Sequence, residues 1–205
     1  MVITPTTSVV SGGPLWMQCP AIKQDHIPGL AYIYPLDQLI VAQKRDTLHD
    51  VIGPGGIAYT IFNSNGQKVF LAVLKKKFRQ FNVKIFNNYG NEVINVKRPF
   101  SLSAKQVLVW APPGKFLGSV QERRRCISTY IVKDESGKKV LKISAVGFCR
   151  NVYKVSVESC GGREVGKMHA GFPVVNVKNF GVTFPQESDV KEKAVLLGAC
   201  FLIGP

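Results

Sequence analysis

The sequence is short of acidic residues and lacks the common catalytic motifs. Only 13 Asp and Glu stand against 27 Lys and Arg, so the net charge is +14 at pH 7. No G-x-S-x-G, P-loop or H-E-x-x-H motif occurs, and the three histidines, His26, His49 and His169, are isolated from one another. We therefore expect a protein that is not an enzyme. The cationic excess suits a polyanionic partner: anionic lipid, nucleic acid or an acidic protein.

Export signals and paired cysteines are also missing. Residues 1–14 have neither a basic flank nor a continuous apolar core, so no secretory signal peptide is indicated. The five cysteines are odd in number and form no C-x-x-C pair, which predicts reduced thiols in a cytosolic setting. They are Cys19, Cys126, Cys149, Cys160 and Cys200.

Long hydrophobic runs are scarce, and the one that stands out covers residues 194–203. Ser188 can cap a helix and Asp189 suits a helix N-terminus, so this run predicts a helix that is apolar on every face. Residues 189–203 would span about 22 Å, whereas a bilayer core of about 30 Å needs roughly 20 residues. A helix enclosed in a protein core is therefore favoured over a membrane anchor. Its expected buried residues include Ala194, Leu197, Gly198, Phe201 and Leu202.

The preceding chain divides into an arm and one domain. Residues 1–27 are rich in Pro, Gly, Ser and Thr and predict a flexible arm. Residues 28–205 predict a single domain, because 205 residues with 45% hydrophobic content can bury one sizeable core. Within it we expect a short helical turn at 35–38, a first strand at 39–44 and turns at 53–56 and 63–66.

Glycine-containing polar turns recur through the middle of the chain. They fall at Gly66, Gly90, Gly114, Gly137 and Gly162, which are 24, 24, 23 and 25 residues apart. A period of about 24 residues with one turn in each unit indicates a repeated β-hairpin. The intervening segments alternate as strands do, with Phe81, Val83 and Ile85 on one face.

Five hairpins with an opening and a closing strand give ten to twelve antiparallel strands, too many for a strongly twisted open sheet. Closure into a barrel removes the sheet edges, but the interior is then too wide for its own side chains to fill. The C-terminal helix is the element apolar enough to fill it. The sequence thus predicts a mainly β fold, a closed antiparallel barrel of about twelve strands that encloses the C-terminal helix.

Eight short segments carry a family resemblance. They are Pro28-Gly29-Leu30 with Tyr32, Asp37-Gln38, Arg98-Pro99-Phe100, Ala111-Pro112-Pro113-Gly114, Val140-Leu141-Lys142-Ile143-Ser144, Val165-Gly166-Lys167, Asn179-Phe180-Gly181-Val182 and residues 193–202. In order and spacing they resemble the phospholipid scramblase family over roughly residues 28–203. The resemblance implies the tubby-like fold. It also implies calcium-triggered, ATP-independent, bidirectional movement of phospholipids between leaflets, at the cytoplasmic face of the plasma membrane.

The calcium segment of that family corresponds here to residues 176–187, where the ligand positions are mostly lost. These positions hold Asn176, Lys178, Phe180, Val182, Phe184 and Glu187. Calcium needs about six or more oxygen ligands, and the Lys178 ammonium opposes a divalent cation. The alternation of Phe180, Val182 and Phe184 predicts a plain strand, the last of the barrel. Calcium is the cofactor that the resemblance implies, and no other is expected.

A second departure concerns membrane attachment. The family's cysteine-rich palmitoylation stretch corresponds to residues 101–110, which contain no cysteine. Basic clusters take its place and predict binding to anionic lipid, since each cation near an anionic leaflet contributes about 1 kcal/mol. The predicted lipid-binding residues are Lys75, Lys76, Lys77, Phe78, Arg79, Arg123, Arg124 and Arg125.

Three functions fit these observations. The first is a scramblase-like protein that moves phospholipids or regulates their movement, with an anionic membrane and protein partners. The second is a soluble module that binds anionic lipid or protein without transport, and the third is a nucleic-acid-binding regulator; for these, the compartment would be the cytoplasm or the nucleus. Nucleic acid is less favoured, because the aromatic residues alternate into the expected core instead of forming a stacking platform.

Overall fold

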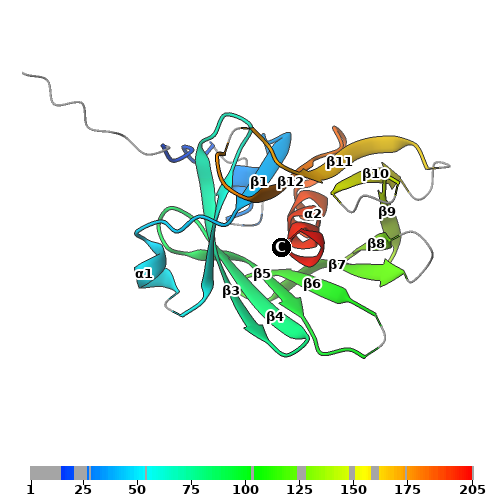
Figure 1. Ribbon diagram of the computed structural model, residues 1–205, viewed down its shortest axis with the longest axis horizontal. Helices are drawn as coiled ribbons and strands as arrows, with labels where there is room; N and C mark the ends of the chain where they lie inside the picture. Colours follow the sequence, from blue (N-terminus) through cyan, green and yellow to red (C-terminus); the bar gives the residue numbers. More distant parts are fainter. Residues whose placement is uncertain are drawn as a thin grey trace, which may run out of the picture.

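Antiparallel strands close into a barrel around a C-terminal helix in the computed structural model (Figure 1). The structure describes residues 15–20, 27, 29–53, 55–102, 104–123, 128–147, 151–157, 162–173 and 175–204. Within these ranges it has twelve strands, each paired with its neighbours in sequence, and β1 closes the barrel on β12. The predicted fold class is confirmed, and the architecture is consistent with the tubby-like fold.

The helices and strands have the following bounds. The strands are β1 (Gln38–Ala42), β2 (Ile57–Phe62), β3 (Lys68–Lys77), β4 (Gln80–Phe86), β5 (Glu92–Arg98), β6 (Gln106–Ala111), β7 (Lys115–Arg123), β8 (Thr129–Asp134), β9 (Lys139–Ala145), β10 (Val152–Val157), β11 (Glu164–Ala170) and β12 (Asn179–Thr183). The helices are the 3₁₀ helix η1 (Ala31–Ile33), α1 (His49–Ile52) and α2 (Val190–Ile203).

Five hairpin turns gather at one end of the barrel, which we call the turn end. They contain the five predicted glycines, whose φ angles lie between 74° and 130°. Three of these turns are stabilised by the same pattern of side-chain to backbone hydrogen bonds. Asn63, Asn87 and Asp134, each three residues before its glycine, accept two backbone N–H bonds through one side-chain oxygen. The 24-residue period is therefore the period of one complete hairpin.

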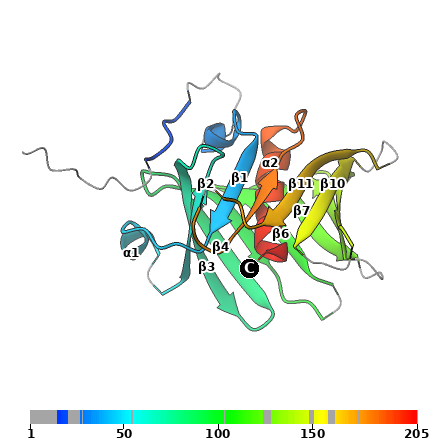
Figure 2. The ribbon, with the colours of Figure 1, turned by 45° about the horizontal axis from the view of Figure 1, so that its top comes forward.

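The other connections leave from the opposite end, which we call the basic end. They join β1 to β2, β3 to β4, β5 to β6, β7 to β8, β9 to β10 and β11 to β12. Helix α2 enters the barrel at the turn end and finishes at the basic end, where Gly204 packs against Phe180 at the start of β12. The helix therefore connects the two ends through the interior, as Figure 2 shows from a second direction.

Helix α2 is the centre of the hydrophobic core. Ala194, Leu197 and Phe201 are buried among inward-facing strand residues, and so are the predicted Gly198 and Leu202. Its main partners are β6, β7 and β12. At Gly198 an added Cβ would lie 2.6 Å from Cγ2 of Val109, so only glycine lets the helix approach β6 this closely. The prediction that this helix is enclosed is confirmed.

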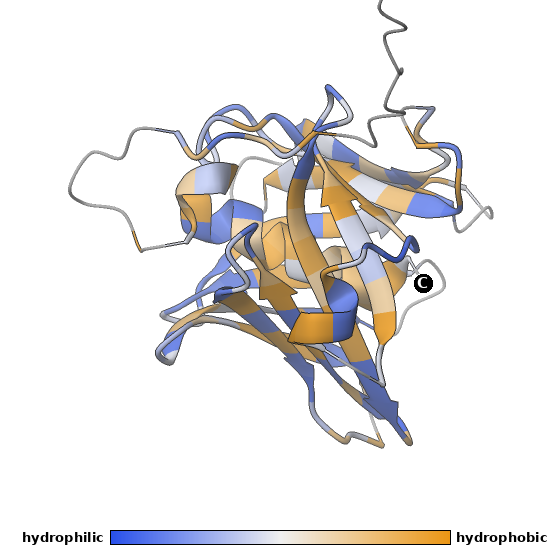
Figure 3. Cartoon of the chain, turned by 90° about the vertical axis from the view of Figure 1, so that its left-hand side faces the viewer, coloured by the Kyte–Doolittle hydropathy of each residue, from blue (hydrophilic) through white to orange (hydrophobic). Residues whose placement is uncertain are grey.

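The barrel wall explains why the strand sequences alternate. Along β4, Phe81, Val83 and Ile85 are buried, whereas Lys84 between them is exposed. Figure 3 shows the same change between hydrophobic and hydrophilic residues along the strands. One face of the sheet thus meets α2, and the other meets solvent or the outer segments of the chain.

Some local predictions were wrong. The helical turn expected at 35–38 is instead the 3₁₀ helix η1, and the first strand begins and ends earlier than 39–44. The N-cap of α2 is Asp189, whose Oδ1 accepts the N–H of Glu192 at 2.6 Å, and not Ser188. In the described part of the chain, no helix has the length and apolar content needed to cross a membrane.

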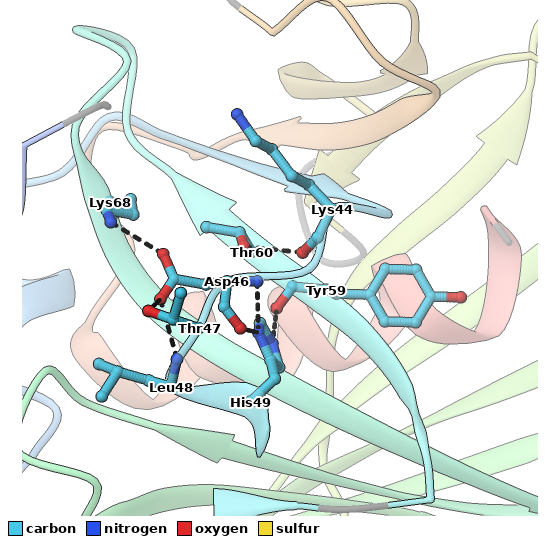
Figure 4. A network of polar contacts seen from close by, with 8 residues as sticks. All are labelled: Lys44, Asp46, Thr47, Leu48, His49, Tyr59, Thr60 and Lys68. Carbon is cyan, nitrogen blue, oxygen red and sulfur yellow. Dashed lines mark hydrogen bonds and ion pairs between the residues drawn. The ribbon is translucent and has the colours of Figure 1, made fainter. Parts of the chain in front are cut away.

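The segment between β1 and β2 is fastened to the outside of the barrel by a polar network (Figure 4). The Asp46 carboxylate pairs with Lys68 Nζ at 2.9 Å. His49 is buried, and its Nδ1 accepts the Asp46 N–H at 2.8 Å, so the proton lies on Nε2, which donates to the Tyr59 carbonyl at 3.0 Å. Burial alone would raise the pKa of Asp46, but its bonds with Lys68 and with the Leu48 N–H lower it.

Candidate functional site

The long β3–β4 hairpin ends in cations gathered around one aromatic side chain. Lys75, Lys76 and Lys77 close β3, and all three are exposed. The chain then reverses at Phe78 and Arg79, where Arg79 adopts a φ of 53°. Phe78 is 76% exposed. An apolar ring therefore stands at the tip of a cationic hairpin, which projects downward in Figure 2.

Further apolar side chains lie next to this tip. The centroids of the Phe78 and Phe100 rings are 6.4 Å apart, and the Arg79 guanidinium lies 5.5 Å from the Phe78 ring. Phe100 and Leu102, in the β5–β6 connection, are 53% and 71% exposed. Most aromatic residues of the strands are in the core, as expected, but Trp110 of β6 and Phe116 of β7 are only half-buried and pack on each other, and Phe78 and Phe100 are exposed.

Strand register places cations from β5 beside those from β3. Phe81 of β4 lies opposite Lys76 on β3 and opposite Arg98 on β5, and residues opposite one another share a face of the sheet. The preceding residue of β5, Lys97, points to the other face, where its Nζ lies 5.5 Å from the Trp110 ring. The hairpin is therefore flanked by cations on both faces.

The second predicted cluster is only partly described. Arg123 is exposed at the last position of β7, at the basic end, with β6 between its strand and the Lys97–Arg98 segment of β5. Arg124 and Arg125 lie outside the described residues. Arg123 therefore lies at the same end of the barrel as the hairpin cations, but strand β6 separates it from the cations of β5.

Seven cations of the basic end have no ion-pair partner in the part of the chain that the structure describes. Among the described residues, none of Lys75, Lys76, Lys77, Arg79, Lys97, Arg98 and Arg123 has a carboxylate within ion-pair distance. Elsewhere several cations are paired, as in Lys84–Glu92 and Lys191–Glu135, both at 2.7 Å. The charge of the basic end is therefore available to an external anion.

The residues aligned with the calcium segment do not converge. Phe180, Val182 and Phe184 are buried in the barrel core, as the strand interpretation predicted. Asn176 precedes β12 at the basic end, whereas Glu187 follows it at the turn end. The two oxygen-bearing side chains are therefore separated by the whole length of β12. No group of three or more His, Cys, Asp or Glu that could hold a metal occurs among the described residues.

Two buried polar residues were missed by the sequence analysis. The Asn179 amide donates to the carbonyls of Phe172, Val175 and Val177 and accepts the Phe172 N–H, so it shapes the chain that precedes β12. Lys193, 8% exposed within α2, donates to two carbonyls of the η1–β1 connection. Burial lowers the pKa of Lys193. The sequence signal that could have found them is a polar residue directly before an apolar stretch, as Asn179 and Lys193 are.

The remaining titratable residues form no catalytic arrangement in the described part of the chain. His49 is bonded to backbone atoms, and His169 stacks on Phe172 with ring centroids 3.8 Å apart. His26 lies outside the described residues. Cys19 and Cys200 are free thiols, and burial raises the pKa of Cys200. Cys126, Cys149 and Cys160 lie outside the described residues.

The fold and this site define a tubby-like barrel with a cationic, aromatic-tipped end. The chain belongs to the scramblase family, whose family model, described as Scramblase, matches residues 17–204. The resemblance predicted from the eight sequence segments is confirmed.

The chain is similar to several proteins named phospholipid scramblase. It is 34% identical to phospholipid scramblase 1 of Rattus norvegicus, over 94% of this chain and 66% of that protein. It is 32% identical to phospholipid scramblase 1 of Homo sapiens, over 94% of this chain and 70% of that protein. It is 30% identical to phospholipid scramblase 2 of Homo sapiens, over 93% of this chain and 74% of that protein. The chain thus spans about two thirds to three quarters of their length. No solved structure matches the chain.

Proposed function

We propose that this protein moves phospholipids between membrane leaflets, bidirectionally and without ATP, or regulates that movement. Membership of the scramblase family and similarity to proteins named phospholipid scramblase support the proposal. The structural observation that carries it is the basic end, where unpaired cations surround exposed apolar side chains. No bond-making or bond-breaking reaction is part of this function, so we do not class the protein as an enzyme.

The basic end has the chemistry of a reversible membrane contact. Each Lys or Arg near an anionic leaflet contributes about 1 kcal/mol, so the four hairpin cations together contribute about 4 kcal/mol. Insertion of the Phe78 ring adds at most about 1.5–3 kcal/mol when the ring is fully buried. The protein would bind the cytoplasmic face of a membrane, and of the plasma membrane by family resemblance.

We also propose that residues 176–187 do not form a calcium site in this chain. Three of the six aligned side chains are apolar and buried, and the other three include a lysine. A calcium site needs about six or more oxygens that converge on one point. Lipid movement by this protein would therefore proceed without calcium at this segment, although the family resemblance implies calcium as a trigger.

Two other functions make different predictions. A module that binds anionic lipid or a protein without transport would bind vesicles but leave the leaflets unmixed. A nucleic-acid-binding regulator would use the same cations, but the exposed Phe78 and Phe100 form one pair at a barrel end and do not form a row along the sheet. Lipid is therefore the favoured ligand of the basic end.

Leaflet exchange in reconstituted vesicles tests the proposal. We expect a fluorescent phospholipid to exchange between leaflets when the protein is present, at the same rate with calcium as with a chelator. Flotation with vesicles of increasing anionic content should show binding that rises with anionic lipid and weakens as salt shortens the Debye length to 8–10 Å or less. Binding without exchange would support the module without transport, and binding to nucleic acid but not to vesicles would support the third function.

A further inference from the structure

A cavity opens at the turn end of the barrel, away from the basic end. Its volume is about 650 Å³, and it lies between the start of α2, the β12–α2 linker and strands β9 to β11. Helix α2 packs mainly on β6, β7 and β12, and the cavity lies beside its first turn, toward β9, β10 and β11. Pockets for small molecules have volumes of roughly 300–1,000 Å³, so this cavity can hold one.

The floor of the cavity is apolar. Leu141 and Phe184 are buried core residues, and Val140, Val157 and Val165 are partly buried and pack against the same core. These side chains come from β9, β10, β11 and the linker, and they lie inside a rim that is charged. An apolar floor with a charged rim suits an amphiphile.

The rim carries charges of opposite sign on its two sides. The strand side supplies Lys138, Lys139 and Arg163, none of which has an ion-pair partner among the described residues. The linker and the helix supply Glu187 and Glu192. A ligand that carries both a phosphate and an ammonium group would match this arrangement.

Two carboxylates near the cavity, those of Asp189 and Glu164, already have partners in the protein. Asp189 accepts the N–H of Glu192 at the start of α2, and its carboxylate there disfavours a second anion. Glu164, also on the rim, is held by Lys154 at 3.0 Å and by Lys167 at 3.6 Å. This leaves the strand-side cations for an anion and the helix-side carboxylates for a cation. Burial, and secondly the nearby Asp189 carboxylate, raise the pKa of Glu192. A cationic group of a ligand beside Glu192 would lower this pKa again.

We propose that this cavity binds one phospholipid with a zwitterionic head group. The phosphate contacts Lys138, Lys139 and Arg163, the ammonium group contacts Glu187 and Glu192, and an acyl chain lies along the apolar floor. The inference rests on the proposed function, because the cavity would be a binding site for the phospholipid that the protein moves. The cavity would bind single lipid molecules by head group, at the end of the barrel opposite to the proposed membrane contact.

The test measures binding of short-chain lipids to the purified 205-residue chain below their micelle concentration, by isothermal titration calorimetry. Dihexanoyl phosphatidylethanolamine should bind. Phosphoethanolamine, which lacks acyl chains, should bind at least about tenfold more weakly because the floor stays empty, and so should dihexanoyl phosphatidylglycerol, which lacks the ammonium group. Equal binding of all three, or no binding of the first, would overturn the inference.

Variants locate the site. Lys139→Gln with Arg163→Gln should weaken the short-chain lipid about tenfold or more by removing phosphate contacts, and Glu187→Gln should reduce the preference for phosphatidylethanolamine over phosphatidylglycerol. The matched control is Lys84→Gln with Lys115→Gln, two exposed cations that belong neither to the cavity nor to the basic end, and it should leave this affinity unchanged. If the control weakens binding as much as the cavity variants do, the site is not this cavity.

The outcome separates this inference from the proposed function. If the parent chain exchanges lipid between leaflets but does not bind the short-chain lipid, the cavity assignment is wrong and the proposed function stands. If the short-chain lipid binds in the cavity but leaflets do not mix, the cavity is a lipid site of a protein without transport. Intact circular dichroism spectra of the cavity variants show that loss of binding does not come from unfolding.

Discussion

The two ends of the barrel are built from one repeated hairpin, but their charges are arranged differently. At the turn end, Asn and Asp side chains close the turns, and cations such as Lys191 meet carboxylates. At the basic end, the cations of β3 and β5 have no described carboxylate within ion-pair distance, and Phe78, Phe100 and Leu102 are exposed beside them. At the turn end, Lys138, Lys139 and Arg163 also have no described carboxylate within ion-pair distance, but they line the cavity.

Turn chemistry explains part of this difference. A hairpin turn whose backbone N–H groups are held by a side-chain oxygen requires Asn or Asp at that position, which brings acceptor groups to the turn end. The β3–β4 turn at the basic end consists of Phe78 and Arg79 and has no such Asn or Asp. One end can therefore be specialised for an anionic surface without loss of the barrel. Helix α2, which runs between the two ends, is buried and tolerates no unpaired charge.

The largest expected effect is on that helix. Leu197→Asp puts a carboxylate without a partner in the buried interior, at a cost greater than the roughly 5–15 kcal/mol by which a domain is stable. We expect loss of the cooperative thermal transition in circular dichroism. The control Leu102→Asp makes the same substitution at the exposed basic end and should melt as the parent does. A normal melt of Leu197→Asp would mean that the helix is not enclosed.

The next effect should distinguish the two ends in membrane binding. Replacing Lys75, Lys76 and Lys77 with Gln removes about 3 kcal/mol of attraction to an anionic leaflet, or roughly 100-fold in vesicle affinity. Co-sedimentation with anionic vesicles measures it. The control removes three other cations toward the turn end, by Lys84→Gln, Lys115→Gln and Lys191→Gln, and should change affinity less than about threefold. Equal losses would show that total charge, and not the basic end, determines binding.

A smaller effect is expected where the helix is fastened at the turn end. Lys193→Met removes the two hydrogen bonds that Lys193 Nζ donates to the carbonyls of Tyr34 and Leu36, and should lower the free energy of unfolding in urea by about 1–3 kcal/mol. The Lys193 pKa is lowered in the folded state from its ordinary 10.5. The unfolded chain therefore binds more protons between the two values, so the parent gains stability over Lys193→Met as pH rises toward 10.5.

The control for this position is Lys191→Met. Lys191 makes a partly exposed ion pair with Glu135, and such pairs contribute about 0–1 kcal/mol. Its unfolding free energy should differ little from that of the parent, with no added dependence on alkaline pH. A Lys193→Met variant as stable as the parent at every pH would show that the two carbonyl bonds do not fasten the helix.

The smallest effect concerns one aromatic ring at each end. Phe78 and Tyr89 are 76% and 73% exposed, at the basic end and the turn end respectively. Phe78→Ser should weaken binding to anionic vesicles by about tenfold, because partial insertion of the ring contributes less than the roughly 1.5–3 kcal/mol of full burial. Tyr89→Ser should have no effect. The loss at Phe78 should persist at high salt, and a loss that disappears there would contradict ring insertion.

Much of the fold could be predicted from local patterns. The spacing from Gly66 to Gly162 indicated repeated hairpins, since turn glycines with positive φ punctuate a chain at fixed intervals. The uninterrupted apolar run in α2 could only be buried, and a closed barrel was the structure that could bury it. The cations at 75–79 were also visible, because an exposed hairpin tip leaves its residue types unconstrained by packing.

Other features depended on contacts between distant residues. The sequence could not show that α2 packs to one side of the barrel and leaves a cavity along β9 to β11, because this depends on how Gly198 meets Val109. Nor could it show that Asn176 and Glu187 lie at opposite ends of β12, or that Lys193 is satisfied by carbonyls more than 150 residues away. Sequence alone determined hairpins, helix and charge, since these follow from neighbouring residues. Tertiary structure decided which charges stay unpaired and where space remains, since both depend on packing between elements far apart in the chain.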